Sequence, residues 1–98
     1  MVSPTSPTVE TDRAPRPLQD ILPPHSVILH DDDYHSMDFV VAALLKSVSS
    51  LTKERATEIM LEADNRGTAV VITCPLEQAE LYRDRIRTFG LAATIERA

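Results

Sequence analysis

The sequence predicts an α+β fold, a two-layer β-α-α-β-α-β sandwich in which a three-stranded sheet is covered by three helices. Three short stretches carry β-branched or alternating apolar residues, which is typical of strands. Three longer stretches repeat apolar residues at helical spacing, and residues typical of helix ends flank them. Short strands and helices in this order form two layers around one core, and 98 residues suffice for one such domain.

The N-terminal part of the chain does not fit this pattern. Residues 1–24 hold six of the seven prolines, with Ser, Thr, Asp, Glu and Arg between them. Proline fixes φ and removes a backbone donor, so neither a helix nor a strand can extend through this part. We therefore expect a disordered extension over residues 1–24 and a folded domain over residues 25–98. The apolar cluster of the extension consists of Leu18, Ile21 and Leu22. It is either the plain end of a linker or a segment that docks onto the domain or onto a partner.

The first strand leads into an acidic loop and a helix. Ser26–His30 is rich in β-branched residues, and Asp31–Ser36 follows as a loop. Ser36 can cap a helix over Met37–Ser49, because its hydroxyl can accept from an early backbone N–H. The apolar residues of that helix wrap nearly all the way round it, so we expect it to be buried on most faces.

A second helix is expected over Lys53–Arg66. Thr52 is a good N-cap, and Gly67 stands where a left-handed C-cap residue belongs. The apolar residues follow the i, i+3, i+4, i+7 pattern of one buried face. They are Ala56, Ile59, Met60 and Ala63.

The last three elements are a strand, a helix and a strand. Ala69–Thr73 is apolar on both faces, which favours a central strand. Pro75 starts the third helix, since its missing N–H costs nothing there, and Gly90 ends that helix. Leu91–Arg97 alternates apolar and polar residues and forms the last strand.

Composition restricts the classes of partner. The formal net charge of −5 argues against a nucleic-acid partner, which requires a basic surface to contact phosphates. No apolar run reaches the roughly 18 residues that span a bilayer, and the N-terminus has no signal-peptide pattern. The single cysteine, Cys74, fits a reducing compartment. We expect a cytoplasmic protein without a membrane partner.

The sequence gives little indication of catalysis. All three histidines lie within residues 25–35, and no nucleophile motif surrounds Cys74 or any serine. Gly67 and Gly90 are the only glycines, so no glycine-rich phosphate loop can form. We expect no enzymatic activity and no cofactor.

The acidic loop leaves a metal site as a weaker alternative. Five residues could supply nitrogen or oxygen ligands: His30, Asp31, Asp32, Asp33 and His35. Their spacing matches neither an EF-hand loop nor a zinc site with paired Cys or His. Clustered loop carboxylates are more often simply solvated, so we expect no metal.

A site for a cation beside apolar surface is a third alternative. Asp31 and Asp32 leave the strand end on alternate sides. Four apolar residues at one-turn spacing on two helices could form a cup beside them: Met37, Val40, Met60 and Ala63. A peptide's free N-terminus, an ammonium beside a side chain, has the complementary form. Composition alone favours the other interpretation, in which these residues are core.

Two sequence stretches resemble the ClpS family. The first is Val27-Ile28-Leu29-His30-Asp31-Asp32-Asp33-Tyr34-His35-Ser36-Met37-Asp38-Phe39-Val40; the second is Glu54-Arg55-Ala56-Thr57 with Met60-Leu61 and Gly67. ClpS proteins are adaptors that hand N-degron substrates to the Clp protease. The resemblance covers residues 25–98 and implies the same order of strands and helices, with a proline-containing extension before them. It also implies a monomer that docks on the N-terminal domain of a Clp-type AAA+ unfoldase.

The resemblance implies which residues bind the substrate's N-terminal residue. Asp31, Asp32 and Asp64 would bind its α-amino group, with Asp31 replacing the family's Asn and Asp64 replacing its His. A pocket for a bulky side chain (Leu, Phe, Tyr or Trp) would be lined by His35, Met37, Val40, Met60, Ala63 and Leu91. Glu77 and Tyr82 occupy positions that contact the unfoldase, Tyr82 in place of a basic residue.

The replaced residues motivate an alternative function. Three carboxylates near one site repel one another, so one can hold its proton, whereas a neutral His would accept from an amine without that cost. A divergent module could therefore keep the fold and the unfoldase contact without binding N-degrons. Asp64 is the residue on which the choice depends.

Overall fold

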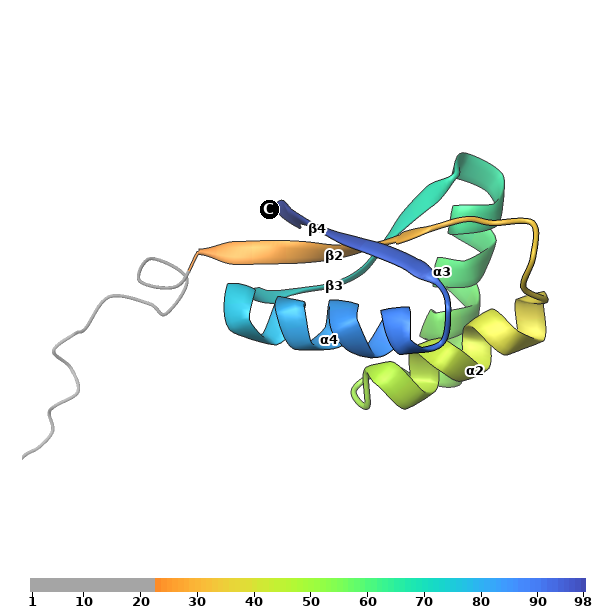
Figure 1. Cartoon of the computed structure of the whole chain (residues 1–98), viewed down its shortest axis with the longest axis horizontal. Coiled ribbons are helices and arrows are strands. Elements are labelled where there is room, and N and C mark those ends of the chain that lie inside the picture. Colours follow the sequence, from red (N-terminus) through yellow and green to blue (C-terminus); the bar gives the residue numbers. More distant parts are fainter. Residues whose placement is uncertain (1–22) are drawn as a thin grey trace, which may run out of the picture.

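The computed structural model describes residues 23–98 (Figure 1). The predicted extension lies outside the described residues except for Pro23 and Pro24, and so does its cluster of Leu18, Ile21 and Leu22. The elements are β2 (Pro24–His30), α2 (Met37–Ser47), α3 (Lys53–Arg66), β3 (Thr68–Pro75), α4 (Leu76–Thr88) and β4 (Ala92–Arg97). The predicted α+β class and the predicted order are confirmed.

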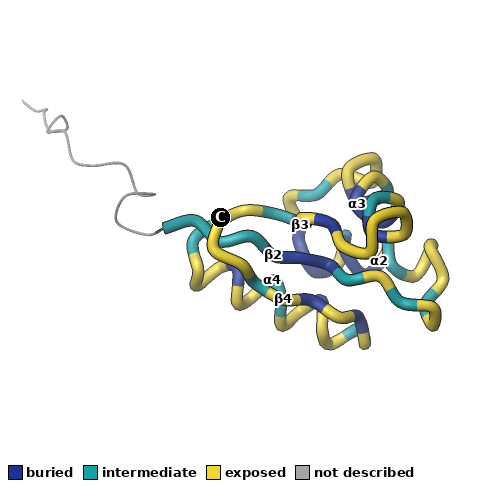
Figure 2. Tube along the Cα trace, turned by 90° about the horizontal axis from the view of Figure 1, so that it is seen from above, coloured by how far each residue is buried: buried dark blue, intermediate teal, exposed yellow. Residues whose placement is uncertain are grey.

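The sheet is antiparallel, with strand order β3-β2-β4. The prediction that Ala69–Thr73 forms the central strand is therefore wrong, because β2 pairs on both sides and β3 lies at an edge. The helices lie on one side of the sheet, and Figure 2 shows β2 buried between its two neighbours. The other face of the sheet is open, so the apolar Val70 on β3 remains 41% exposed.

The core is aliphatic and lies between the sheet and the helices. Val27 and Leu29 of the central strand are almost completely buried. The cluster around them draws on every described helix and strand and includes Leu44, Val48, Ile59, Val71, Ile86 and Ala93. This core fixes β2 against α3 and α4, and therefore fixes the point at which the acidic loop begins.

Helix α2 is less buried than the sequence predicts. It packs mainly against α3 and α4 rather than on the sheet, and its buried residues form one stripe of Ala43, Leu44 and Ser47. Met37 is 49% exposed and Phe39 is 38% exposed. The predicted burial on most faces is wrong, because α2 lies at the end of the molecule, with solvent beside its first turn (Figure 1). The helix also ends at Ser47, two residues earlier than predicted.

The predicted helix caps are confirmed. Ser36 Oγ accepts from the Phe39 N–H at 3.1 Å, and Thr52 Oγ1 accepts from the Arg55 N–H at 3.1 Å. Gly67 ends α3 with a φ of 90°, a left-handed conformation that glycine adopts without a Cβ clash. Pro75 ends β3 and is the N-cap residue of α4. In residues 23–98, the helices are too short or too polar to cross a membrane.

Candidate functional site

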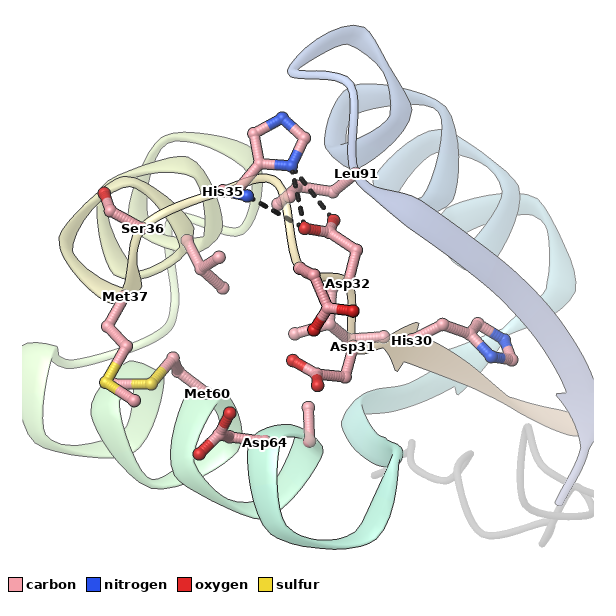
Figure 3. Close-up of a pocket in the computed structure, with 13 residues that line it drawn as sticks. His30, Asp31, Asp32, His35, Ser36, Met37, Met60, Asp64 and Leu91 are labelled. Carbon is pink, nitrogen blue, oxygen red and sulfur yellow. Dashed lines mark hydrogen bonds and ion pairs between the residues drawn. The ribbon is translucent and has the colours of Figure 1, made fainter.

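A cavity of about 230 Å³ opens at the end of β2 (Figure 3). Four segments surround it: the loop between β2 and α2, the first turns of α2, the last turns of α3, and the residue before β4. The residues that line it are Leu29, His30, Asp31, Asp32, Asp33, His35, Ser36, Met37, Val40, Met60, Ala63, Asp64 and Leu91. This set includes all nine residues that are predicted to bind the N-terminal residue of a substrate.

One part of the cavity wall is apolar. Met60 and Ala63 are buried on α3, and Leu91 is buried before β4. Met37 reaches in from α2 and stays half exposed, and Figure 3 shows the Met37 and Met60 side chains pointing toward each other. Methionine side chains are unbranched and flexible, so this part of the wall can adapt to different ligand shapes.

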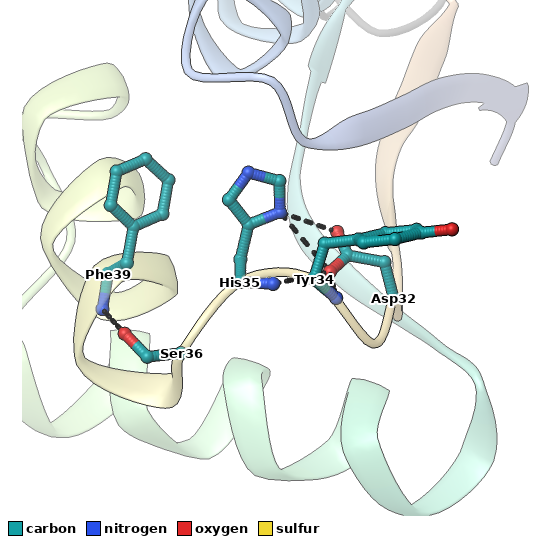
Figure 4. Close-up of polar contacts among 5 residues, drawn as sticks. All are labelled: Asp32, Tyr34, His35, Ser36 and Phe39. Carbon is teal, nitrogen blue, oxygen red and sulfur yellow. Dashed lines mark hydrogen bonds and ion pairs between the residues drawn. The ribbon is translucent and has the colours of Figure 1, made fainter.

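Asp32 holds the loop in its conformation (Figure 4). Its Oδ1 accepts from the N–H of Tyr34 at 2.8 Å and from the N–H of His35 at 2.9 Å. Its Oδ2 accepts from Nδ1 of His35 at 2.9 Å. Burial favours the neutral carboxyl, but these hydrogen bonds and the adjacent imidazole outweigh it and lower the pKa of Asp32 below its ordinary value. Most of its acceptor capacity is therefore used inside the loop.

Asp31 and Asp64 differ from Asp32 in this respect. The Asp31 backbone N–H donates to the Gly67 carbonyl at 2.9 Å, which ties the strand end to the end of α3. Both side chains are exposed, and among residues 23–98 no donor is hydrogen-bonded to either carboxylate. Figure 3 shows Asp31 beside the strand end and Asp64 on α3, on the two sides of the opening. These two carboxylates are open to a cation at the cavity mouth.

His35 lines the cavity, but its ring is directed away from the opening. Nδ1 contacts Asp32, and the ring stacks on Phe39 with centroids 5.0 Å apart and planes 21° apart. The sequence-based assignment treated His35 as a wall residue for a substrate side chain. In the structure its contacts are with other parts of the protein.

Sequence reasoning did not assign four lining residues to this site: Leu29, His30, Asp33 and Ser36. His30, Asp33 and Ser36 each adjoin an assigned residue in the chain, and Leu29 lies two residues before Asp31, so proximity was the available signal. His30 is directed to the sheet, where its Nε2 lies 2.7 Å from Thr94 Oγ1. Within residues 23–98, no three His, Cys, Asp or Glu side chains are grouped as metal ligands are.

The two predicted unfoldase-contact residues lie on α4. Glu77 is exposed in the first turn, where it lines a shallower hollow of about 800 Å³ with Pro23, Pro75 and Leu76. Tyr82 packs partly against the core. The first turn of α4 lies at the opposite end of the sheet from the start of α2, so Glu77 and the cavity are well separated (Figure 1).

The chain is similar to a known protein family over most of its length. Residues 21–94 match the family described as ATP-dependent Clp protease adaptor protein ClpS. The ClpS adapter protein of Synechococcus elongatus is 42% identical over 90 residues, covering 90% of this chain and 95% of that protein. The ClpS adapter of Gloeobacter violaceus is 41% identical over 75 residues, covering 76% of this chain and 81% of that protein.

A solved structure shows the same fold. Agrobacterium tumefaciens ClpS2, bound to L-phenylalaninamide, matches with a TM-score of 0.71 and 26% identity over 76% of this chain and 96% of that chain. The chain belongs to the ClpS family of ATP-dependent Clp protease adaptor proteins.

Proposed function

We propose that this protein is an adaptor that binds the N-terminal residue of N-degron substrates in the cavity and delivers them to a Clp-type AAA+ unfoldase. The observation that carries the proposal is a cavity with one apolar wall, whose mouth holds two carboxylates, Asp31 and Asp64, that accept from no donor within residues 23–98. The similar ClpS2 is bound to L-phenylalaninamide, which combines a free α-amino group with an apolar side chain. Adaptor action requires binding and no chemical step by the chain itself.

Asp31 and Asp64 are the proposed acceptors for the α-ammonium group. Each hydrogen bond to a charged group contributes about 1.5–3 kcal/mol. Asp31 lies beside the strand end and Asp64 lies on α3, on the two sides of the opening, so both carboxylates can accept from one ammonium group. Asp32 supports them, because its hydrogen bonds order the loop that carries Asp31, and Oδ2 keeps some capacity to accept from a ligand.

The apolar wall is the proposed pocket for the first side chain. It is formed by Met37, Val40, Met60, Ala63 and Leu91. Full burial of a Leu or Phe side chain contributes about 1.5–3 kcal/mol. The cavity, about 230 Å³, is below the roughly 300–1,000 Å³ of pockets for drug-sized ligands, a size that suits one residue rather than a longer segment.

The proposed partner is the N-terminal domain of the unfoldase, bound by a monomer through the surface around Glu77. Glu77 is exposed at the first turn of α4, and Tyr82 lies further along the same helix, partly packed on the core. Because this surface and the cavity lie at opposite ends of the sheet, a substrate and the unfoldase can bind together. Glu77→Arg should weaken unfoldase binding and leave peptide binding unchanged.

The test is a titration with peptides that differ only in residue one. Fluorescent peptides beginning with Phe or Leu should bind, those beginning with Ala should bind at least tenfold more weakly, and N-acetylated Phe should not bind. Ala in place of Phe removes most of the free energy gained by burying the side chain, and acetylation removes the hydrogen bonds of the ammonium group. Equal binding by Leu, Phe and acetylated Leu would contradict the proposal.

The alternative, a module that docks on the unfoldase without N-degron binding, is motivated by Asp64 in the family's His position. It predicts unfoldase binding with no dependence on residue one of any peptide. Asp64→His separates the two functions. A large gain in affinity from undetectable wild-type binding would support the alternative, whereas measurable wild-type binding with a modest change would support the proposed function.

A further inference from the structure

We infer that His35 is a positioning residue for the cavity, because its ring joins the acidic loop to α2 and to the turn between α4 and β4. The inference rests on the proposed function for its effect on peptide binding. The contacts that define it are internal to the protein and can be tested separately.

The first contact orders the loop. Nδ1 of His35 lies 2.9 Å from Oδ2 and 3.2 Å from Oδ1 of Asp32. An ionised carboxylate only accepts, so Nδ1 must carry the proton in this contact, whether the ring is neutral or charged. The same carboxylate also accepts from the backbone N–H groups of Tyr34 and His35 (Figure 4). All three contacts therefore stabilise one conformation of the loop.

The second and third contacts connect this loop to the rest of the cavity wall. The ring stacks on Phe39 of α2, and Phe39 meets the Phe89 ring edge-on, with centroids 6.4 Å apart. The ring edge also lies against Gly90, where an added Cβ would be 3.3 Å from Nε2. Gly90 directly precedes Leu91 of the cavity wall.

Three of the four segments around the cavity therefore meet at His35. The loop supplies Asp31, α2 supplies Met37, and the turn supplies Leu91. The fourth segment, α3, is held by its own buried face. His35 sets the distance between the carboxylate of the loop and the apolar wall, although its ring points away from the opening (Figure 3).

The experiment compares three substitutions at this position in the full chain. His35→Asn keeps an amide donor near the place of Nδ1–H, His35→Phe keeps an aromatic ring without the donor, and His35→Ala removes both. His25→Phe is the matched control, since His25 Nδ1 bonds the Pro23 carbonyl at the other end of the sheet. The readouts are hydrogen exchange of the Tyr34 amide, exchange of the core Ile59 amide, and the Kd of a Phe-initiated peptide.

We expect His35→Phe to speed Tyr34 exchange and raise the Kd, each roughly tenfold, because loss of one charge-assisted hydrogen bond has about that effect. His35→Ala should exceed it, because it removes both the donor and the ring. His35→Asn keeps a donor but loses the ring that stacks on Phe39, so its loss should be smaller than that of His35→Ala. Ile59 exchange and the His25→Phe control should stay unchanged. A ¹H–¹⁵N spectrum of the wild type should show the proton on Nδ1.

Three results would overturn the inference. They are a proton on Nε2 alone, Tyr34 exchange unaffected by His35→Phe, or an equal loss in His35→Asn and His35→Ala. If the wild type binds no peptide at all, the proposed function fails, yet Tyr34 exchange and the ring tautomer still decide whether His35 orders the loop.

Discussion

The two sides of the cavity are held by different forces. On the α3 side, Ala56, Ile59, Met60 and Ala63 form one buried stripe, so Asp64 sits on a helix fixed by apolar packing. On the loop side, the described residues around Asp31 are mostly exposed, and Asp32 and His35 hold the chain with hydrogen bonds and ring stacking. A carboxylate acceptor is thus presented from a rigid helix on one side and from a polar network on the other.

This difference assigns separate roles to the acidic residues. Asp64 and Asp31 face the opening with carboxylates that accept from no donor in the described part of the chain, whereas both oxygens of Asp32 accept hydrogen bonds within the loop. The three aspartates that the resemblance assigns to the α-amino group therefore divide into two proposed ligands, Asp31 and Asp64, and one residue that orders the loop, Asp32. Disturbing the α3 side should affect the whole fold, and disturbing the loop side should affect the site locally.

The largest effect is expected for Ile59→Ala on the α3 side. Ile59 is completely buried, and truncating such a side chain costs about 2–5 kcal/mol of unfolding free energy through lost burial and a residual cavity. Leu61→Ala, at a site 43% exposed on the same helix, should cost less than about 1 kcal/mol. Urea unfolding measures the loss of unfolding free energy in both variants. Equal losses would contradict the claim that apolar packing holds α3 in place.

The next effect is expected for Asp32→Ala on the loop side. The loop loses its acceptor for two backbone N–H groups and one imidazole N–H, worth about 1.5–3 kcal/mol of local opening free energy. Tyr34 exchange should rise at least tenfold while Ile59 exchange changes little. Asp33→Ala is the matched control, because its exposed carboxylate accepts from no donor within residues 23–98. A uniform rise across the chain would show that the two sides are not independent.

A smaller effect on stability is expected for alanine substitutions at Gly67 and Gly90, the two glycines with positive φ. Gly67→Ala at φ 90° meets no atom within 4 Å, so it should cost only the left-handed strain of about 1–2 kcal/mol. Gly90→Ala at φ 84° carries the same strain and also crowds His35. Thermal unfolding should show a greater loss for Gly90→Ala, and the excess should vanish in a His35→Ala background. An excess that persists there would contradict the ring contact.

The smallest effect is the pH dependence of the loop. The folded state lowers the pKa of Asp32, so its contribution to stability is full above about pH 4, where the unfolded-state carboxyl is also ionised. That contribution is lost as pH falls through the lowered folded-state pKa. The difference in stability between wild type and Asp32→Ala should shrink below pH 4 in urea titrations. A stability difference between wild type and Asp32→Ala that grows on acidification would contradict a lowered pKa of Asp32 in the folded state.

The sequence predicted the α3 side better than the loop side for a physical reason. Helical periodicity and the caps at Thr52 and Gly67 are local patterns, so α3 and its buried face could be identified directly. All nine residues that the resemblance assigned to substrate binding line one cavity. The Asp32–His35 network was missed, because three consecutive aspartates do not indicate which one turns back toward the backbone. The central strand was misassigned, because apolar residues on both faces of a strand do not indicate whether it pairs with one neighbour, as β3 does, or with two, as β2 does.

The most direct test of the account is one NMR titration. The protein carries ¹³C labels in the Asp carboxyl carbons and in the Met methyl groups, and the ligand is L-phenylalaninamide. We predict that the Asp31 and Asp64 carboxyls and the Met37 and Met60 methyls shift together with one Kd, and that N-acetyl-phenylalaninamide shifts none of them. Methyl shifts without carboxyl shifts, or equal binding of the acetylated compound, would contradict the claim that the cavity binds an N-terminal residue.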